Sequence, residues 1–221
     1  YVMELGTNAR AFEPRRTHLL LAPSAGAGFG APHAVWEGAT VPWRTRVIGG
    51  RLRYFVYTNA DKLYAPRPEP TTVEVWSSDD GIDWRAEPGP IHRGGTEFDG
   101  VELDDGSVLG VTRFEGPRNW GSAIMRGRLD DPPSFEASAR DDRRKFDSPS
   151  VFRHGNRVLM TARRQVAFDG AFDQGWDWLP LTLRTRLYQG LYSLTRKRST
   201  LWEIEPATLD VTRLADLPSR G

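Results

Sequence analysis

Three carboxylates stand where a repeated sheet could bring them together: Asp99, Asp147 and Glu115. Each aspartate follows a phenylalanine and comes before an apolar run, and Glu115 follows the end of another such run. A carboxyl that protonates a leaving oxygen and a carboxylate that activates water or attacks carbon are what hydrolysis of a glycosidic bond requires. We therefore predict these three as candidate catalytic groups. Glu97 and Glu102 could also complete such a set, and the two aspartates could instead hydrogen-bond a neighbouring sheet.

Three arginines accompany these carboxylates: Arg113, Arg163 and Arg164. A planar guanidinium can hold a carboxylate through two parallel hydrogen bonds, so an arginine cluster would suit an anionic sugar. The chain contains 30 Lys and Arg residues, of which only three are lysines. Many of the arginines must therefore be ordinary surface charge, and both roles stay open for these three.

The elements that would position these groups are predicted to be short antiparallel strands. Runs of alternating apolar and polar residues, separated by Gly, Asp and Asn turns, recur from Arg46 to Leu217. No long amphipathic helix is evident. The expected strands are 45–47, 52–57, 73–77, 100–103, 108–113, 150–153, 157–162, 201–205 and 210–214.

An internal repeat selects among the all-β architectures. The stretch that begins at Phe98 matches the one that begins at Phe146, with an offset of 48 residues at the aspartates and 50 at Arg113 and Arg163. This period is typical of a four-stranded propeller blade. We predict a single all-β domain, 1–221, with the fold of a β-propeller of four-stranded antiparallel blades. The blade-like units are 43–90, 97–140 and 145–217, with a partial blade at 1–42, as a fragment of a five- or six-bladed ring.

One sharp motif supports the propeller. Residues 77–84 read Ser-Ser-Asp-Asp-Gly-Ile-Asp-Trp and match the pattern Ser-x-Asp-x-Gly-x-x-Trp. Its physics is that of a hairpin tip: Asp79 can accept hydrogen bonds from turn amides, Gly81 can take a positive φ, and Trp84 can pack beneath the loop.

In this motif the chain resembles the Asp-box, or BNR repeat, of sialidases and related propellers of the glycoside-hydrolase type. Sialidases usually carry several Asp-boxes and an early Arg-Ile-Pro, whereas this chain has one box and no Arg-Ile-Pro. The resemblance is therefore to the broader class of sialidase-like propellers. It implies a protein that hydrolyses or binds a carbohydrate, and the alternative is a non-catalytic module that binds a glycan or a protein.

The segment 165–199 is too long for a hairpin and is rich in aromatic residues. A connection of this length inside a compact domain is usually functional or disordered. Because aromatic faces stack on sugar rings, Trp176 and Trp178 could form a binding platform at the mouth of the channel. The alternative is that the segment packs against the outer sheet or a second subunit.

Composition excludes several classes of partner. The formal net charge of +1 gives no global field for nucleic acid or an anionic membrane, and no apolar run is long enough to span a bilayer. The chain has no cysteine, and its four histidines show no metal-ligand spacing. We expect a soluble protein, cytoplasmic or secreted, with no metal and no cofactor. The sequence does not indicate an oligomeric state.

Overall fold

The computed structural model describes residues 1–7, 12–63, 69–115, 119–130, 132–141, 143–166, 176, 178–192 and 194–218, without the side chains of 136 and 137. The chain forms antiparallel sheets, as the alternating pattern predicted. The elements are β1 (Val2–Leu5), β2 (Pro14–Leu19), β3 (His33–Glu37), β4 (Val41–Ile48), β5 (Arg51–Thr58), a 3-10 turn (Ala60–Lys62), β6 (Thr72–Ser78), β7 (Arg85–Ala86), β8 (His92–Arg93), β9 (Gly95–Glu102), β10 (Val108–Phe114), β11 (Ser122–Arg128), β12 (Ser134–Asp141), β13 (Asp147–His154), β14 (Arg157–Val166), α1 (Leu181–Leu191), β15 (Arg196–Ile204) and β16 (Val211–Asp216).

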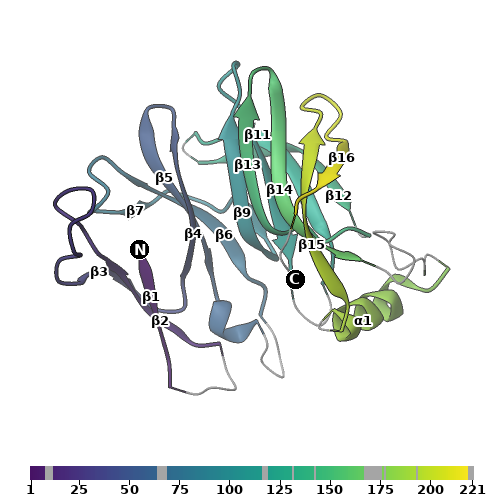
Figure 1. Ribbon diagram of the computed structural model, residues 1–221, viewed down its shortest axis with the longest axis horizontal. Helices are drawn as coiled ribbons and strands as arrows, with labels where there is room; N and C mark the ends of the chain where they lie inside the picture. The colour runs from purple at the N-terminus through teal and green to yellow at the C-terminus, as the bar shows by residue number, and fades with distance from the viewer. Residues whose placement is uncertain are drawn as a thin grey trace.

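Each sheet is built from strands that are consecutive in the chain. The strand orders are β1-β2-β3, β4-β5-β6-β7 with β8 also paired to β6, β9-β10-β11-β12, and β13-β14-β15-β16. The first strand of one sheet contacts the first strand of the next, β4 against β9 and β9 against β13. Figure 1 shows the β4–β7 sheet on the left and the two later sheets on the right. This is the blade arrangement of a β-propeller, with β4, β9 and β13 as inner strands.

The cores lie between neighbouring blades. Phe98 of β9 packs edge-on against Phe55 of β5, with ring centroids 4.8 Å apart, and Phe146 packs in the same way against Trp202 of β15 at 5.1 Å. Both repeat phenylalanines are fully buried. Gly110 in β10 leaves the space that the Phe98 ring fills, because a Cβ there would lie 2.2 Å from the ring. Blade stacking therefore depends on large rings fitted to small residues.

A polar clasp joins the three inner strands. The buried Asp99 carboxylate in β9 accepts hydrogen bonds from Arg46 Nε of β4 at 2.9 Å, from an Arg46 terminal nitrogen at 2.5 Å and from the Val151 amide of β13 at 2.7 Å. Arg46 also donates to the Val151 carbonyl at 3.1 Å, and the Gly100 amide donates to Asp99 at 3.0 Å. The predicted place of Asp99 at a strand entry is wrong, because β9 begins at Gly95 and puts Asp99 in mid-strand.

The segment 165–199 contains a helix that the sequence analysis did not predict. Strands β14 and β15 extend into it, pairing as far as Val166 with Arg196, and α1 lies beside their ends (Figure 1). Of the residues that the structure describes, none belong to a helix of the length and apolarity needed to cross a bilayer.

The motif at 77–84 forms the turn between β6 and β7, the two outer strands of its blade. The acceptor of the turn amides is Asp80, not Asp79 as predicted: its Oδ1 accepts from the amides of Ile82 at 2.8 Å and Asp83 at 2.9 Å. Ser78 Oγ accepts from the Gly81 amide at 2.9 Å, and Asp79 Oδ1 instead accepts from Arg51 Nε at 3.2 Å. Gly81 has a φ of 77°, and Trp84 Nε1 donates to the Gly81 carbonyl at 3.1 Å.

Candidate active site

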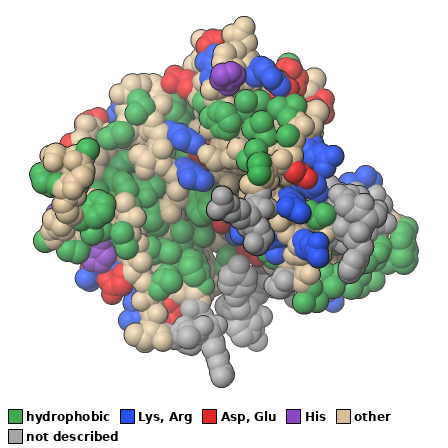
Figure 2. All heavy atoms as spheres, in the orientation of Figure 1, with side chains coloured by type: hydrophobic (Ala, Val, Ile, Leu, Met, Phe, Trp, Pro, Cys, Tyr) green, Lys and Arg blue, Asp and Glu red, His purple; other side chains and the backbone are tan. Residues whose placement is uncertain are grey.

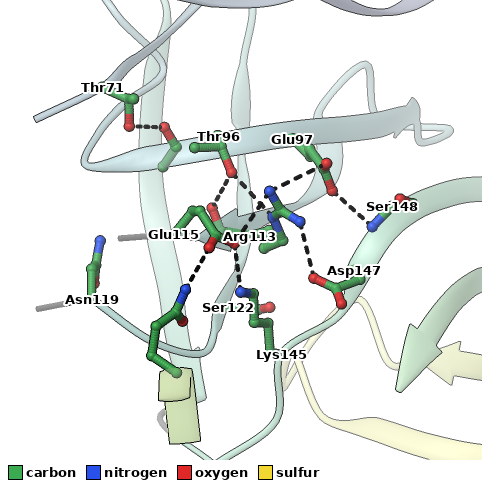
Figure 3. A network of polar contacts seen from close by, with 12 residues as sticks. Thr71, Thr96, Glu97, Arg113, Glu115, Asn119, Ser122, Lys145, Asp147 and Ser148 are labelled. Carbon is green, nitrogen blue, oxygen red and sulfur yellow. Dashed lines mark hydrogen bonds and ion pairs between the residues drawn. The ribbon is translucent and has the colours of Figure 1, made fainter. Parts of the chain in front are cut away.

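Three carboxylates from two blades surround one buried guanidinium. Arg113 of β10 has one terminal nitrogen 3.3 Å from Glu97 Oε1 and 3.3 Å from Glu115 Oε2, and its other terminal nitrogen is 3.1 Å from Asp147 Oδ1. Arg113 Nε donates a hydrogen bond to Thr96 Oγ1 at 3.4 Å. Figure 3 shows these side chains converging on Arg113, and we call Glu97, Arg113, Glu115, Lys145 and Asp147 the Arg113 cluster.

A bulge at the start of β13 brings two of these carboxyls together. The pairing of β13 with β14 shifts between Asp147 and Ser150, and Ser148 has a φ of 51°, which is unusual for a residue with a side chain. In this conformation the Ser148 amide donates to Glu97 Oε2 at 2.8 Å (Figure 3). Asp147, one residue earlier, meets Arg113. The bulge therefore links the β13 entry to the β9 glutamate.

Glu115 is the most tightly held of the three carboxylates. Its Oε2 accepts from Lys145 Nζ at 2.5 Å and its Oε1 accepts from Gln189 Nε2 of α1 at 2.7 Å. Lys145 also lies over aromatic rings, with Nζ 4.9 Å from the Trp120 centroid and 4.3 Å from that of Tyr192. Helix α1 and the residue that follows it thus contact the cluster.

The carboxylates differ in how many of their oxygens are engaged. Both oxygens of Glu115 and both of Glu97 have contacts, but the contact of Glu97 with Arg113 is a long 3.3 Å. Asp147 uses Oδ1 alone, and its Oδ2 has no hydrogen-bond partner among the described residues. Asp147 is therefore the member with an oxygen left for another group.

Burial and charge separate the pKa values of the cluster. Burial raises the pKa of Glu97, and nearby Arg113 only partly offsets this. Burial also acts on Glu115, but the charges of Arg113 and Lys145 outweigh it and lower the pKa of that carboxyl. Burial lowers the pKa of Lys145, with Glu115 opposing. A carboxyl with a raised pKa beside a carboxyl with a lowered pKa is an arrangement that acid–base chemistry uses.

The predicted site residues are only partly gathered in this cluster. Arg113, Glu115 and Asp147 meet there, whereas Asp99 lies in the inter-blade clasp. Arg163 is exposed on β14. Arg164 is buried and reaches Asp216 of the outermost strand, with hydrogen bonds of 3.0 and 2.6 Å.

The two tryptophans of the predicted platform differ in their surroundings. Trp176 is half-buried and stacks on Tyr188 of α1, with ring centroids 5.8 Å apart. Trp178 is 78% exposed. The Trp176 ring thus contacts α1, the helix that also contacts the Arg113 cluster through Gln189. Trp178, in contrast, faces solvent.

Two members of the site were not singled out from the sequence. Lys145 directly precedes the Phe146-Asp147 pair and is one of only three lysines in the chain, a signal that could have been used. Gln189 gave no signal, because its role depends on the position of a helix that was not predicted. Glu97 stood only among the alternatives, although it lies two residues from Asp99 on the same strand face.

Two further features lie outside the cluster. Among the described residues, no group of three or more His, Cys, Asp or Glu side chains is placed to hold a metal ion. A cavity of about 270 Å³ lies at the β9–β10 and β13–β14 turns, lined by Leu103 and Asn156 of the turns and by Arg126 of β11 and Arg153 of β13. Those turns are at the opposite ends of β9 and β13 from Glu97 and Asp147, so this cavity is separate from the Arg113 cluster.

Comparison with solved structures places the fold among known propellers. An α-L-arabinofuranosidase from Lactobacillus brevis matches with a TM-score of 0.53 and 11% sequence identity, over 84% of this chain and 61% of that one. Two variants of a levansucrase from B. megaterium match with TM-scores of 0.45 and 0.44 and 9% identity, over 80% and 89% of this chain and 54% and 58% of theirs. No family model and no curated protein matches the sequence. The chain shares its fold with the arabinofuranosidase and spans 61% of that chain.

Proposed function

We propose that this propeller hydrolyses a glycosidic bond, as a sialidase-like glycoside hydrolase in the broad sense. The observation that carries the proposal is the Arg113 cluster, in which the first strand of one blade and the first strand of the next contribute a carboxyl each, Glu97 and Asp147, to one guanidinium. Glycoside hydrolysis requires two carboxyls, one as the acid and one as the base or nucleophile.

The roles follow from the contacts. Glu97 is the general acid, because burial raises its pKa and so favours the protonated form that donates to the leaving oxygen. Asp147 is the carboxylate that activates water or attacks carbon, because Oδ2 has no partner among the described residues. Glu115 and Arg113 hold these two in place. Arg113 is already occupied by carboxylates of the chain, which favours a neutral sugar over an anionic one.

Turnover of aryl glycosides tests these roles. The wild type and Glu97→Gln are assayed on a panel of 4-nitrophenyl glycosides that includes the α-L-arabinofuranoside, with Asp104→Asn as an exposed-carboxylate control. Loss of a general acid lowers turnover by roughly 10²–10⁴-fold. It lowers it far less for a 2,4-dinitrophenyl glycoside, whose leaving group needs no proton. Equal losses on both substrates would remove Glu97 from the acid role.

The matching test for Asp147 uses an added nucleophile. Asp147→Ala is expected to abolish turnover, and azide is expected to restore part of it with formation of a glycosyl azide. Circular dichroism confirms that each variant is folded. Wild-type turnover that persists in Asp147→Ala contradicts the assignment.

A second candidate function is glycan binding without catalysis. Trp178 favours it, because a tryptophan that is 78% exposed beside the stacked Trp176 and Tyr188 rings offers a free face for a sugar. A glycan array probed with the wild type and with Trp178→Ala separates the two functions. Binding that is lost in Trp178→Ala, with no turnover of any glycoside by the wild type, favours the binding module.

A further inference from the structure

Helix α1 buries polar side chains and exposes leucines, which is the reverse of an ordinary amphipathic helix. Its buried residues are Thr185 and Tyr188, and the polar Gln189 reaches inward to Glu115. Leu183 and Leu187, one helical turn apart, are 45% and 38% exposed. A surface helix normally packs its leucines on the core and turns polar residues outward. The two leucines therefore leave much of their apolar surface open to solvent.

The apolar surface continues on both sides of the helix. Trp178 and Leu181 before Leu183 are 78% and 47% exposed, and Leu194 after the helix is 80% exposed. We call Trp178, Leu181, Leu183, Leu187 and Leu194 the α1 surface. Figure 2 shows hydrophobic side chains gathered at the lower right, where Figure 1 places α1. Single exposed leucines are ordinary, but a contiguous set marks an interaction site.

The charged residues in the stretch of sequence that carries this surface are all basic. From Trp178 to Trp202 the sequence contains five basic residues and no acidic one. Arg186 lies beside Leu187 and is exposed, as is Arg196 at the start of β15. The nearest preceding aspartates, at 169, 173 and 177, lie outside the described residues. The formal net charge of +1 is summed over the whole chain and therefore does not show this local excess of basic residues.

We propose that the α1 surface docks on the surface of an anionic lipid bilayer, with α1 lying in the plane of the interface. Exposed tryptophan and leucine side chains enter the boundary between headgroups and acyl chains. Arginines beside them keep their guanidinium groups at the lipid phosphates. Charge complementarity selects this occupant, because residues 178–202 offer five cationic side chains and no acidic one to a negative surface. The expectation of no membrane partner rested on net charge, which does not report local segregation.

Co-sedimentation with vesicles tests the proposal on the full chain. The wild type is mixed with vesicles of 70% phosphatidylcholine and 30% phosphatidylserine, and with vesicles of phosphatidylcholine alone. Two variants remove the exposed groups, Leu183→Gln with Leu187→Gln, and Arg186→Gln with Arg196→Gln. Leu214→Gln with Arg85→Gln is the matched control, since Leu214 is exposed on β16 and Arg85 on β7, both outside the α1 surface. Circular dichroism checks that all are folded.

The wild type and the control are expected to sediment with the anionic vesicles and not with the neutral ones. Each arginine removed should weaken partitioning about fivefold, and added salt should weaken it further. No sedimentation of the wild type, or equal sedimentation of all three variants, overturns the proposal. So does a concentration-dependent dimer in size-exclusion chromatography that Leu183→Gln with Leu187→Gln abolishes while vesicle binding is absent, because the occupant is then a second copy of the chain.

Discussion

Substitution of Asp99 by alanine tests whether the inter-blade clasp holds the propeller together. The change removes the one carboxylate that touches all three inner strands, accepting from Arg46 on β4 and from the Val151 amide on β13. The side chain is fully buried, so no water replaces it without entering the contact between blades. The substitution therefore leaves buried hydrogen-bond donors without an acceptor, which costs more than the loss of the bonds alone.

The expected cost can be worked from these donors. The Val151 and Gly100 amides each lose a buried acceptor, and an unsatisfied buried group costs about 1–3 kcal/mol. Arg46 loses its partner as well, but its side chain is 31% exposed and can turn to water, so its share is discounted. We expect Asp99→Ala to lower the free energy of unfolding by about 3–5 kcal/mol, a large part of the stability of an ordinary domain.

Urea denaturation followed by tryptophan fluorescence measures this loss. Asp104→Ala is the control, because that carboxylate is 84% exposed and also pairs with one arginine. Its midpoint should not change measurably. A double-mutant cycle with Arg46→Ala then isolates the pair. A loss below about 1 kcal/mol for Asp99→Ala would refute the reasoning, since the buried amides would then have found other partners.

Three further predictions test blade stacking, the cluster and the contact of α1 with it. Gly110→Ala should cost at least about 1–3 kcal/mol by overpacking against the ring that fills this space, whereas Gly28→Ala, with open space around it, should cost little in the same urea assay. Because burial raises the pKa of Glu97 above 4.5, the folded state retains its proton more strongly, so stability should fall as pH rises from 4.5 through the raised pKa. Urea midpoints across that range should lose this fall in Glu97→Gln. Gln189→Ala leaves Glu115 Oε1 without its partner and should cost about 1.5–3 kcal/mol, measured as a lower thermal midpoint.

The blade pattern could be predicted because the same kinds of buried residue recur at matching places in successive blades. Phe98 and Phe146 begin matching stretches in the sequence, and both are buried in cores between blades. The match did not predict how far along its strand each aspartate lies. Asp99 is the fifth residue of β9 and Asp147 the first of β13, because the turn after β9 is longer than the one after β13. A pattern of residue types fixes the face of a strand but not its register against another blade.

The candidate site could be predicted only where its members lie on a strand or directly after one. Arg113, Glu115 and Asp147 were singled out from strand ends, and they meet. Gln189 lies on a helix whose outward leucines give no core-facing stripe, so the helical period carried no signal. The same feature that concealed α1 from the sequence analysis is the one that marks its outer face as an interaction surface.

Strand β9 connects the stability of the propeller to the geometry of the proposed site. Glu97 and Asp99 are two residues apart, so they point to the same face, roughly 7 Å from each other along the strand. Both contact backbone amides of β13, Glu97 that of Ser148 and Asp99 that of Val151. Because the Asp99 contacts fix how β9 lies against β13, they also fix the distance between Glu97 and Asp147. The rigid position that the proposed catalysis needs is therefore supplied by a carboxylate that does not itself meet the cluster.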